Sequence, residues 1–352
     1  MNITRSIHFL RFGFAAFAVF GLAVAGFAQA AAPTEPLRVV ATSTDLASLA
    51  REIGGGRVKV FCLSQGPEDP HTIEVRPGFV RELSAADLFI QVGLGLENAW
   101  LKDLLANVKN ADLKPGGKLN LNLGRGVRLL EGVEGTGIAG SFHEEGNPHY
   151  LLDPVEGLKA AKTICDRFSA LRPAWTNEFE QRHEAFEKKL KTALAGAECA
   201  KDADFEAVVL QFERAKSKAE LDALLKEHQL GGWLAALLPY RGRVIVGDHD
   251  LWPYFARRYG LEILGYLEPS PGVPPTTKHL QALIGQMKER KVGVILSAPY
   301  FDARHARFAA ERSGAKVTPM AHQTGGRAGT EDYFSMLRYN AEQLLKALGE
   351  AK

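Results

Sequence analysis

Four histidines of this sequence stand where their side chains could bind one metal ion together. They are His71, His149, His249 and His322. A neutral imidazole is the commonest metal ligand among protein side chains, and a set of such nitrogens suits Zn²⁺, with Zn–N distances of ~2.0–2.1 Å. Harder and larger cations prefer oxygen ligands. The four histidines therefore predict a zinc site with two ligands from each half of the chain.

All four predicted ligands lie in loops. His71 follows the predicted strand 58–63, His249 and His322 each stand three residues after a predicted strand, and His149 stands at the crossover between the two halves. In open α/β sheets, ligands bind outside the carboxyl ends of the strands. A single loop histidine is more often solvated or a hydrogen-bonded cap, so it is the joint placement that indicates a site.

Carboxylates accompany these histidines in the sequence. They are Asp69, Glu74, Asp153, Asp248 and Asp250. Each could bind the metal directly or fix the tautomer of a liganding imidazole through a hydrogen bond, and we favour the second role for most of them. Asp248 and Asp250 could equally cap the helix predicted to begin near Leu251. His143, in the glycine- and glutamate-rich loop 131–146, could help to recruit the metal.

Strands alternate with helices in both halves of the chain, as the apolar patterns and turn signals predict. In the first half the predicted strands are 37–42, 58–63, 88–92, 118–121 and 127–130, and the helices are 45–53, 76–86 and 99–108. In the second half the strands are 243–246, 262–266, 292–296 and 316–319, and the helices are 251–259, 277–290, 303–313 and 331–348. Because parallel strands need a crossover, the alternation predicts α/β lobes with mostly parallel sheets.

Further helices are predicted between the two halves. Residues 154–171 have a helical pattern, and so do residues 175–195, where aromatic and leucine side chains recur at helical spacing. At ~1.5 Å per residue the second helix is roughly 30 Å long, and we interpret it as a rigid connector. The segment 204–238 is also helical, and the sequence assigns it no function.

The first 30 residues are predicted to be a secretory signal peptide. Arg5 and Arg11 precede the apolar run 12–27, and residues 28–30 have the small-x-small form of a cleavage site. The sequence has no cysteine near this cut to carry a lipid anchor. We therefore expect an exported, periplasmic protein that does not insert into the membrane after the signal is cleaved.

The net charge and the cysteine content bear on the possible partners and on the possible kinds of metal site. The chain has 43 basic and 41 acidic residues, and the two arginines of the leader account for the difference. A neutral balance gives no reason to expect nucleic-acid or anionic-membrane partners. Three cysteines without a Cys-x-x-Cys pair exclude a cysteine-rich zinc site, and we expect buried, unpaired thiols, with a single disulfide as the alternative.

Four motifs in this order resemble the zinc/manganese substrate-binding proteins of ABC transporters. They are residues 69–77, 147–154, 247–249 leading into 254–261, and 329–340. The match covers most of the mature chain. It implies an α/β fold of two Rossmann-like lobes with mostly parallel sheets, joined by a single long connecting helix, with the metal in the cleft between the lobes. We place the N-terminal lobe at 31–153, the helical connector at 154–200 and the C-terminal lobe at 201–352.

The resemblance also implies roles for particular residues. It assigns His71 and His149 as ligands from the first lobe and His249 as a ligand from the second, at a position where manganese receptors commonly carry glutamate. Zinc is therefore expected ahead of manganese. The fourth ligand of the family is usually acidic and lies in the loop before the last helix, where His322 is the nearest candidate. The alternatives for this position are Glu331, Asp332 and water.

The function implied by the resemblance is capture without catalysis. A monomeric, exported protein would bind Zn²⁺, or less readily Mn²⁺, and deliver it to the membrane permease of an ABC transporter. A metal held by four protein ligands has no open position at which to activate water, whereas a catalytic zinc keeps one.

Two other functions would also use some of these residues. The first is a zinc hydrolase with three histidines, water and Glu74 or Asp248 as general base, but the sequence contains neither His-Glu-x-x-His nor Gly-x-Ser-x-Gly. The second is a receptor for a chelated metal or a small organic ligand, which would need aromatic walls around its site. The candidates for such walls are Trp100, Tyr150, Trp252 and Tyr300.

Overall fold

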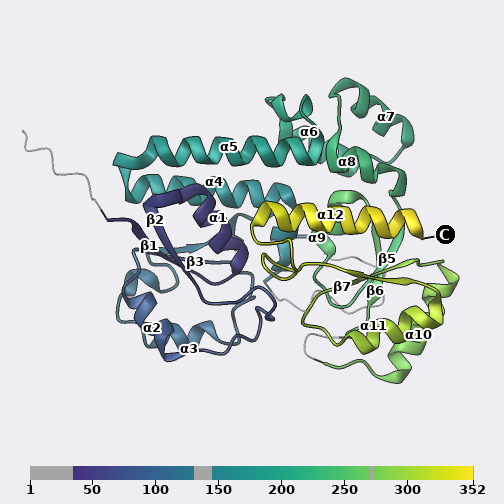
Figure 1. The fold of residues 1–352 in the computed structure, drawn as a ribbon, viewed down its shortest axis with the longest axis horizontal. Coiled ribbons are helices and arrows are strands. Elements are labelled where there is room, and N and C mark those ends of the chain that lie inside the picture. Colours follow the sequence, from purple (N-terminus) through teal and green to yellow (C-terminus); the bar gives the residue numbers. More distant parts are fainter. Residues whose placement is uncertain (1–34, 131–144, 270–272, 352) are drawn as a thin grey trace, which may run out of the picture. The chain divides into compact units, whose positions relative to one another are not determined.

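A four-stranded parallel sheet forms the first part of the structure (Figure 1). The computed structural model describes residues 35–130, 145–269 and 273–351, so the predicted signal peptide lies outside the described residues. The elements of this part are β1 (Leu37–Ala41), α1 (Thr44–Gly54), β2 (Val58–Cys62), α2 (Pro77–Ser84), β3 (Leu88–Gln91), α3 (Leu101–Ala106) and β4 (Asn120–Asn122). The strand order is β2-β1-β3-β4. Because a helix connects each strand to the next, all four carboxyl ends lie at one edge of the sheet.

A second four-stranded parallel sheet has the same layout. Its elements are β5 (Val244–Gly247), α9 (Pro253–Tyr259), β6 (Glu262–Tyr266), α10 (Thr277–Glu289), β7 (Val294–Ser297), α11 (Ala303–Ser313), β8 (Lys316–Pro319) and α12 (Tyr333–Glu350). The strand order is β6-β5-β7-β8. The predicted α/β fold with two parallel sheets is confirmed.

Local sequence signals fix where several of these helices begin and end. The side chain of Ser43 caps α1 by accepting a hydrogen bond from Leu46 N, and Asp332 and Ser335 form a capping box at the start of α12. Gly314 ends α11 with a φ of 84°, a left-handed conformation that glycine adopts without steric cost. These caps set the points at which the loops near the strand ends start and stop.

Two long helices follow the first sheet in the sequence and precede the second, and they pack against each other. They are α4 (Pro154–Leu171) and α5 (Thr176–Ala195), and their contact includes Phe168 and Phe179, whose ring centroids are 5.5 Å apart. Helix α5 also packs on α1 of the first part and on α8 (Gly232–Leu237), as Figure 1 shows. Helix α5 thus contacts both the first part of the chain and the segment 204–238, and its role as a connector stays a prediction. The lobe boundaries at 153/154 and 200/201 stay a prediction.

The segment 204–238 consists of three short helices. They are α6 (Phe205–Arg214), α7 (Lys218–Glu227) and α8. Helix α6 buries Phe205, Val208, Val209 and Phe212 in the main hydrophobic core. The neighbouring polar residue Glu213 has a side chain only 6% exposed and lies among three arginines. This segment is thus part of the folded body, and the carboxylate of Glu213 near the end of α6 is almost fully covered.

One predicted strand is wrong. Residues 127–130 form no strand, whereas the weak signal at 118–121 corresponds to β4. Strand β4 is the edge of its sheet, and a 3-10 turn at Leu123–Gly126 directs the chain away from that edge. Val127 and Leu130 pack against the main core as partly buried side chains. Their apolar pattern reflects this packing and not pairing with a neighbouring strand.

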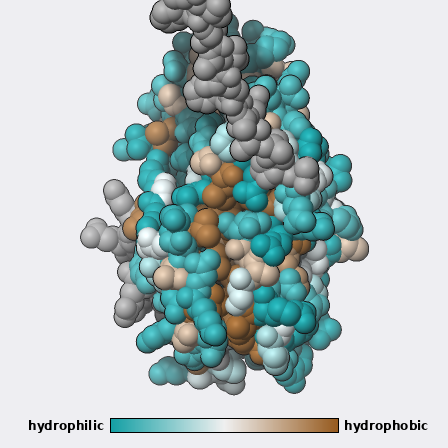
Figure 2. Space-filling model, turned by 90° about the vertical axis from the view of Figure 1, so that its left-hand side faces the viewer, coloured by the Kyte–Doolittle hydropathy of each residue, from teal (hydrophilic) through white to brown (hydrophobic). Residues whose placement is uncertain are grey.

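The face shown in Figure 2 is mostly hydrophilic. Figure 2 shows one face on which hydrophobic residues lie between hydrophilic ones, and the large hydrophobic side chains that are exposed among the described residues are Val75, Leu129 and Val273. Within the part of the chain that the structure describes, no helix is long and apolar enough to cross a membrane. The three cysteines are free, as expected, although Cys62 is only partly buried.

Candidate metal centre

Three of the four predicted histidines meet at one point. One nitrogen from each of His71, His149 and His249 lies within 4.8 Å of the others. The ring centroids are 5.1 Å apart for the first and second, 5.7 Å for the first and third, and 6.0 Å for the second and third. The rings of His149 and His249 are buried, at 7% and 3% exposure. The three rings thus face a common space that a single small cation can bridge.

The loop after β2 holds His71 through its neighbours. Asp69 Oδ1 accepts a hydrogen bond from His71 N at 3.0 Å and lies 2.7 Å from His71 Nδ1. Burial raises the pKa of Asp69, but the hydrogen bonds from His71 outweigh it and keep the pKa below its ordinary value. The ionised carboxylate favours a proton on Nδ1 and so the tautomer with its lone pair on Nε2. Trp100 fixes the same loop by donating from Nε1 to Pro70 O at 3.1 Å.

His149 begins a short 3-10 turn, His149–Leu152, just before α4. Asn147 shapes this turn, because its Oδ1 accepts a hydrogen bond from His149 N at 2.9 Å. The amide nitrogen of the same side chain donates to Asp250 O, also at 2.9 Å. Asn147 therefore ties the segment that carries His149 to the loop that carries His249.

His249 lies two residues after β5 and is held by carboxylates on both sides. Its Nδ1 is 2.8 Å from Glu268 Oε2, and its main-chain N donates to Asp248 Oδ1 at 3.0 Å. Burial raises the pKa of Asp248 to about 6, although hydrogen bonds from Ala298 N and Trp252 Nε1 lower it. Sequence reasoning missed Glu268. The available signal was its place two residues after β6, the strand that pairs with β5.

Removal of the Glu268 carboxylate is expected to weaken metal binding. Outer partners of liganding histidines contribute about 10- to 100-fold in metal affinity, so Glu268→Ala should raise the dissociation constant by that factor. Glu268→Gln, which keeps an oxygen acceptor near Nδ1, should lose less. Titration calorimetry on both variants tests this, and equal affinities in Glu268→Ala and the parent chain would contradict it.

The fourth predicted ligand, His322, is not brought into the group of three. Its Nε2 donates to the Glu68 carbonyl at 2.9 Å, and its ring centroid is 4.7 Å from that of Tyr300. Burial lowers the pKa of His322 to about 4, so the ring is neutral at pH 7. The acidic alternatives are also engaged, since Glu331 accepts from Gly329 N and Asp332 caps α12.

The loop that carries His322, residues 320–330, holds the loop that carries His71. Gln323 Nε2 donates to Gln65 O at 2.9 Å and to Gly66 O at 3.2 Å, across more than 250 residues of sequence. Thr324 donates from both its main-chain N and its hydroxyl to Asp45 Oδ1 at 2.7 Å. Burial raises the pKa of Asp45 to about 6, and the bonds from Thr324 only partly offset this.

The two loops touch so closely that only glycine fits at their contact. A Cβ at Gly66 would come within 2.3 Å of the main chain of Gly325, whose φ is 74°. Neither this contact nor the roles of Gln323 and Thr324 were predictable from the sequence. Hydrogen bonds to main-chain carbonyls leave no residue pattern from which their acceptors could be predicted.

The remaining predicted candidates lie apart from the three rings or support them indirectly. Glu74 is exposed, Asp250 accepts a hydrogen bond from Tyr266 OH, and Asp153 pairs with arginines. His143 lies outside the described residues. Of the four aromatic residues considered as ligand walls, three belong to the hydrophobic core. These are Trp100, Tyr150 and Trp252.

Comparison with known proteins gives one family. The family described as "Zinc-uptake complex component A periplasmic" matches residues 39–203 and 206–347. Among curated proteins, the metal ABC transporter substrate-binding lipoprotein FimA of Streptococcus parasanguinis is 24% identical over 94% of this chain and 96% of its own length. The manganese ABC transporter substrate-binding lipoprotein PsaA of Streptococcus pneumoniae is also 24% identical, over 90% of each chain.

Solved structures share the fold. The crystal structure of ZnuA superposes with a TM-score of 0.65 at 23% identity, covering 89% of this chain and 100% of that one. The Mn-bound periplasmic metal binding protein from Candidatus Liberibacter asiaticus gives a TM-score of 0.63 at 17% identity, covering 88% of this chain and 98% of that chain. Both likenesses support the fold of two parallel sheets.

Proposed function

Because the chain belongs to the family of periplasmic zinc-uptake complex component A proteins, we propose that it captures Zn²⁺ outside the cytoplasmic membrane and delivers it to an ABC permease. Its family and relatives are substrate-binding components of ABC transporters. The chain is therefore a metal-binding receptor for ABC uptake and not an enzyme, and a permease is its partner. In this proposal the metal is the cargo and not a resident cofactor.

The convergence of His71, His149 and His249 carries the proposal. Three imidazole nitrogens with carboxylates behind two of them form a donor set that suits zinc better than manganese, because manganese favours oxygen ligands. Relatives of this chain include proteins named for manganese, so the description of the family does not by itself choose the metal, and the donor atoms of this chain favour zinc.

The proposed ligands are the three converging histidines, with His322 as the fourth. Because the Nε2–H of His322 donates to the Glu68 carbonyl, the ring would join them through Nδ1, and this requires the loop that carries it to move closer to the three rings. A water molecule can complete a tetrahedral zinc site when His322 stays in place. We further propose that the chain is exported by cleavage near Ala30 and works in the periplasm as a monomer.

A pair of experiments tests the choice of metal. Calorimetric titration of metal-stripped protein should show one tight zinc site per chain and weaker binding of manganese. Because any nitrogen site binds zinc ahead of manganese in the Irving–Williams order, the decisive measurement is made in cells. Cells that lack this chain should accumulate less zinc from a zinc-limited medium, with manganese uptake unchanged. A loss of manganese uptake instead would reject the proposed cargo.

A further inference from the structure

The turn that carries His149 is attached at both of its ends to the segment that follows His249. At its start, the Asn147 amide donates to Asp250 O at 2.9 Å. At its end, Asp153 accepts two hydrogen bonds from Arg258 of α9, from Nε and from a terminal nitrogen, each at 2.8 Å. Between these points, the rings of Tyr150 and Tyr254 meet edge to face, with centroids 6.5 Å apart. The turn is thus attached to the segment 250–258 at both of its ends and between them.

The contact between Asp153 and Arg258 is the strongest of these attachments. It is a two-pronged ion pair in which the side chains are 0% and 4% exposed. Such a pair fixes direction as well as distance, because the planar guanidinium matches the carboxylate at two points. Asp153 stands four residues after His149, and Arg258 nine residues after His249. One ion pair therefore joins the chain segments of two metal ligands.

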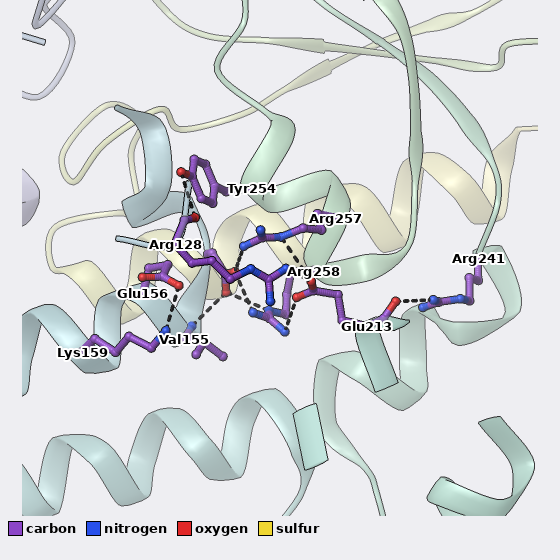
Figure 3. A network of polar contacts seen from close by, with 10 residues as sticks. Arg128, Val155, Glu156, Lys159, Glu213, Arg241, Tyr254, Arg257 and Arg258 are labelled. Carbon is purple, nitrogen blue, oxygen red and sulfur yellow. Dashed lines mark hydrogen bonds and ion pairs between the residues drawn. The ribbon is translucent and has the colours of Figure 1, made fainter. Parts of the chain in front are cut away.

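Helix α6 completes this arrangement from the other side of Arg258. Glu213 Oε2 lies 3.2 Å from the second terminal nitrogen of Arg258, and Glu213 Oε1 lies 2.8 Å from Arg128. The main-chain carbonyl of Glu213 accepts a hydrogen bond from Arg241. Figure 3 shows these arginines gathered around Glu213. Arg258 thus binds Asp153 through Nε and one terminal nitrogen, and its other terminal nitrogen pairs with Glu213. Through Glu213, the segment 204–238 helps to hold Arg258 in place.

We propose that Arg258, held by Glu213 and paired with Asp153, is a positioning residue that sets the spacing between the metal ligands His149 and His249. The inference rests on the proposed function, because it concerns how the same three-histidine site is kept ready for a metal. Arg258 does not touch the metal. It acts by fixing the turn that carries His149 against the helix that follows His249.

The zinc affinity depends on the fraction of metal-free molecules in which the three histidines are already correctly spaced. When only a fraction of the metal-free molecules holds its ligands at the binding distance, the apparent dissociation constant rises by the inverse of that fraction. Loss of the pair with Arg258 leaves the ends of the turn attached by Asn147 and by the longer contact of Arg257 with Asp153, 3.6 Å between nitrogen and oxygen, so the ligands spend less time at the correct spacing. A fall of the competent fraction to about one tenth lowers affinity about tenfold, the lower end of what supporting residues contribute at metal sites.

Three variants and one control test the proposal. Asp153→Asn keeps an oxygen that can cap α4 but removes the charge that Arg258 binds. Arg258→Lys keeps the charge and loses the two-pronged geometry, and Glu213→Gln leaves the pair intact while loosening Arg258. The matched control is Glu178→Gln, which breaks the two-pronged, exposed pair between Glu178 and Arg57. Zinc affinity by competition with a chromogenic chelator and the unfolding temperature of the metal-free protein are measured for each.

The expected result is a graded loss of affinity in folded protein. Asp153→Asn should bind zinc about tenfold more weakly well below its unfolding temperature, Arg258→Lys and Glu213→Gln should lose less, and Glu178→Gln should match the parent. If Asp153→Asn does not fold, the other two variants decide. Lower unfolding temperatures with unchanged zinc affinity would overturn the proposal and leave the pair purely structural. Failure of the parent chain itself to bind zinc would instead reject the proposed function.

Discussion

Replacement of His71 and His149 together by alanine is expected to abolish tight metal binding. Zinc bound by four ligands in small domains gains about 12 kcal/mol, or roughly 3 kcal/mol per ligand, so loss of two ligands should cost about 6 kcal/mol. That corresponds to an increase of about 10⁴ in the dissociation constant. Titration of the metal-stripped double variant should therefore show no saturable zinc site at micromolar concentrations.

A double variant at two other histidines serves as the control. His228 and His305 do not belong to the converging group, and replacing both removes the same number of imidazoles. The control should bind one zinc ion with the affinity of the parent chain. Full retention of affinity in the variant lacking His71 and His149 would show that the three rings are not the metal site.

Removal of the metal is expected to lower the stability of the protein by several kcal/mol. The three histidines come from separate parts of the chain, and unfolding disperses them, so the ion binds the folded state and hardly the unfolded one. At a free zinc concentration a thousand times the dissociation constant, binding should add about 4 kcal/mol to the free energy of unfolding. Thermal unfolding with excess zinc and with excess chelator measures the difference.

The same measurement carries its own control. In the variant that lacks His71 and His149, the unfolding temperature should be the same with zinc and with chelator. The parent chain should show a higher unfolding temperature as zinc is raised, because stabilisation by a ligand grows with the logarithm of its concentration. An identical shift in both proteins would mean that zinc stabilises the fold at some place other than the three histidines.

Much of the fold was predictable because most strands and helices can be recognised from the local pattern of apolar and capping residues. A β-branched run such as β1, followed by the capping residue Ser43 and an amphipathic helix, contains the information for its own structure. The failure at residues 127–130 has the opposite cause. An apolar stretch can pack on a core without pairing as a strand, and only the position of β4 at the sheet edge decides between the two.

The site divides in the same way. The residue types, the places of His71 and His249 after predicted strands and the place of His149 at the crossover were enough to select these three, because parallel strands bring their carboxyl ends to one edge. The same reasoning selected His322 equally well. That the main-chain carbonyl of Glu68 accepts a hydrogen bond from this ring could not be predicted, because the two residues are 254 positions apart in the sequence.

Apart from the strand expected at 127–130, the sequence by itself determined the elements, the donor atoms and the loops from which they come. Tertiary structure alone decided which rings converge, that Glu268 stands behind His249, and that Arg258 reaches Asp153 across 105 residues. The physical reason is that an imidazole or a carboxylate is recognisable by its type, whereas its partner is chosen by distances of a few ångströms. Those distances exist only after the two sheets and the helices between them have packed together.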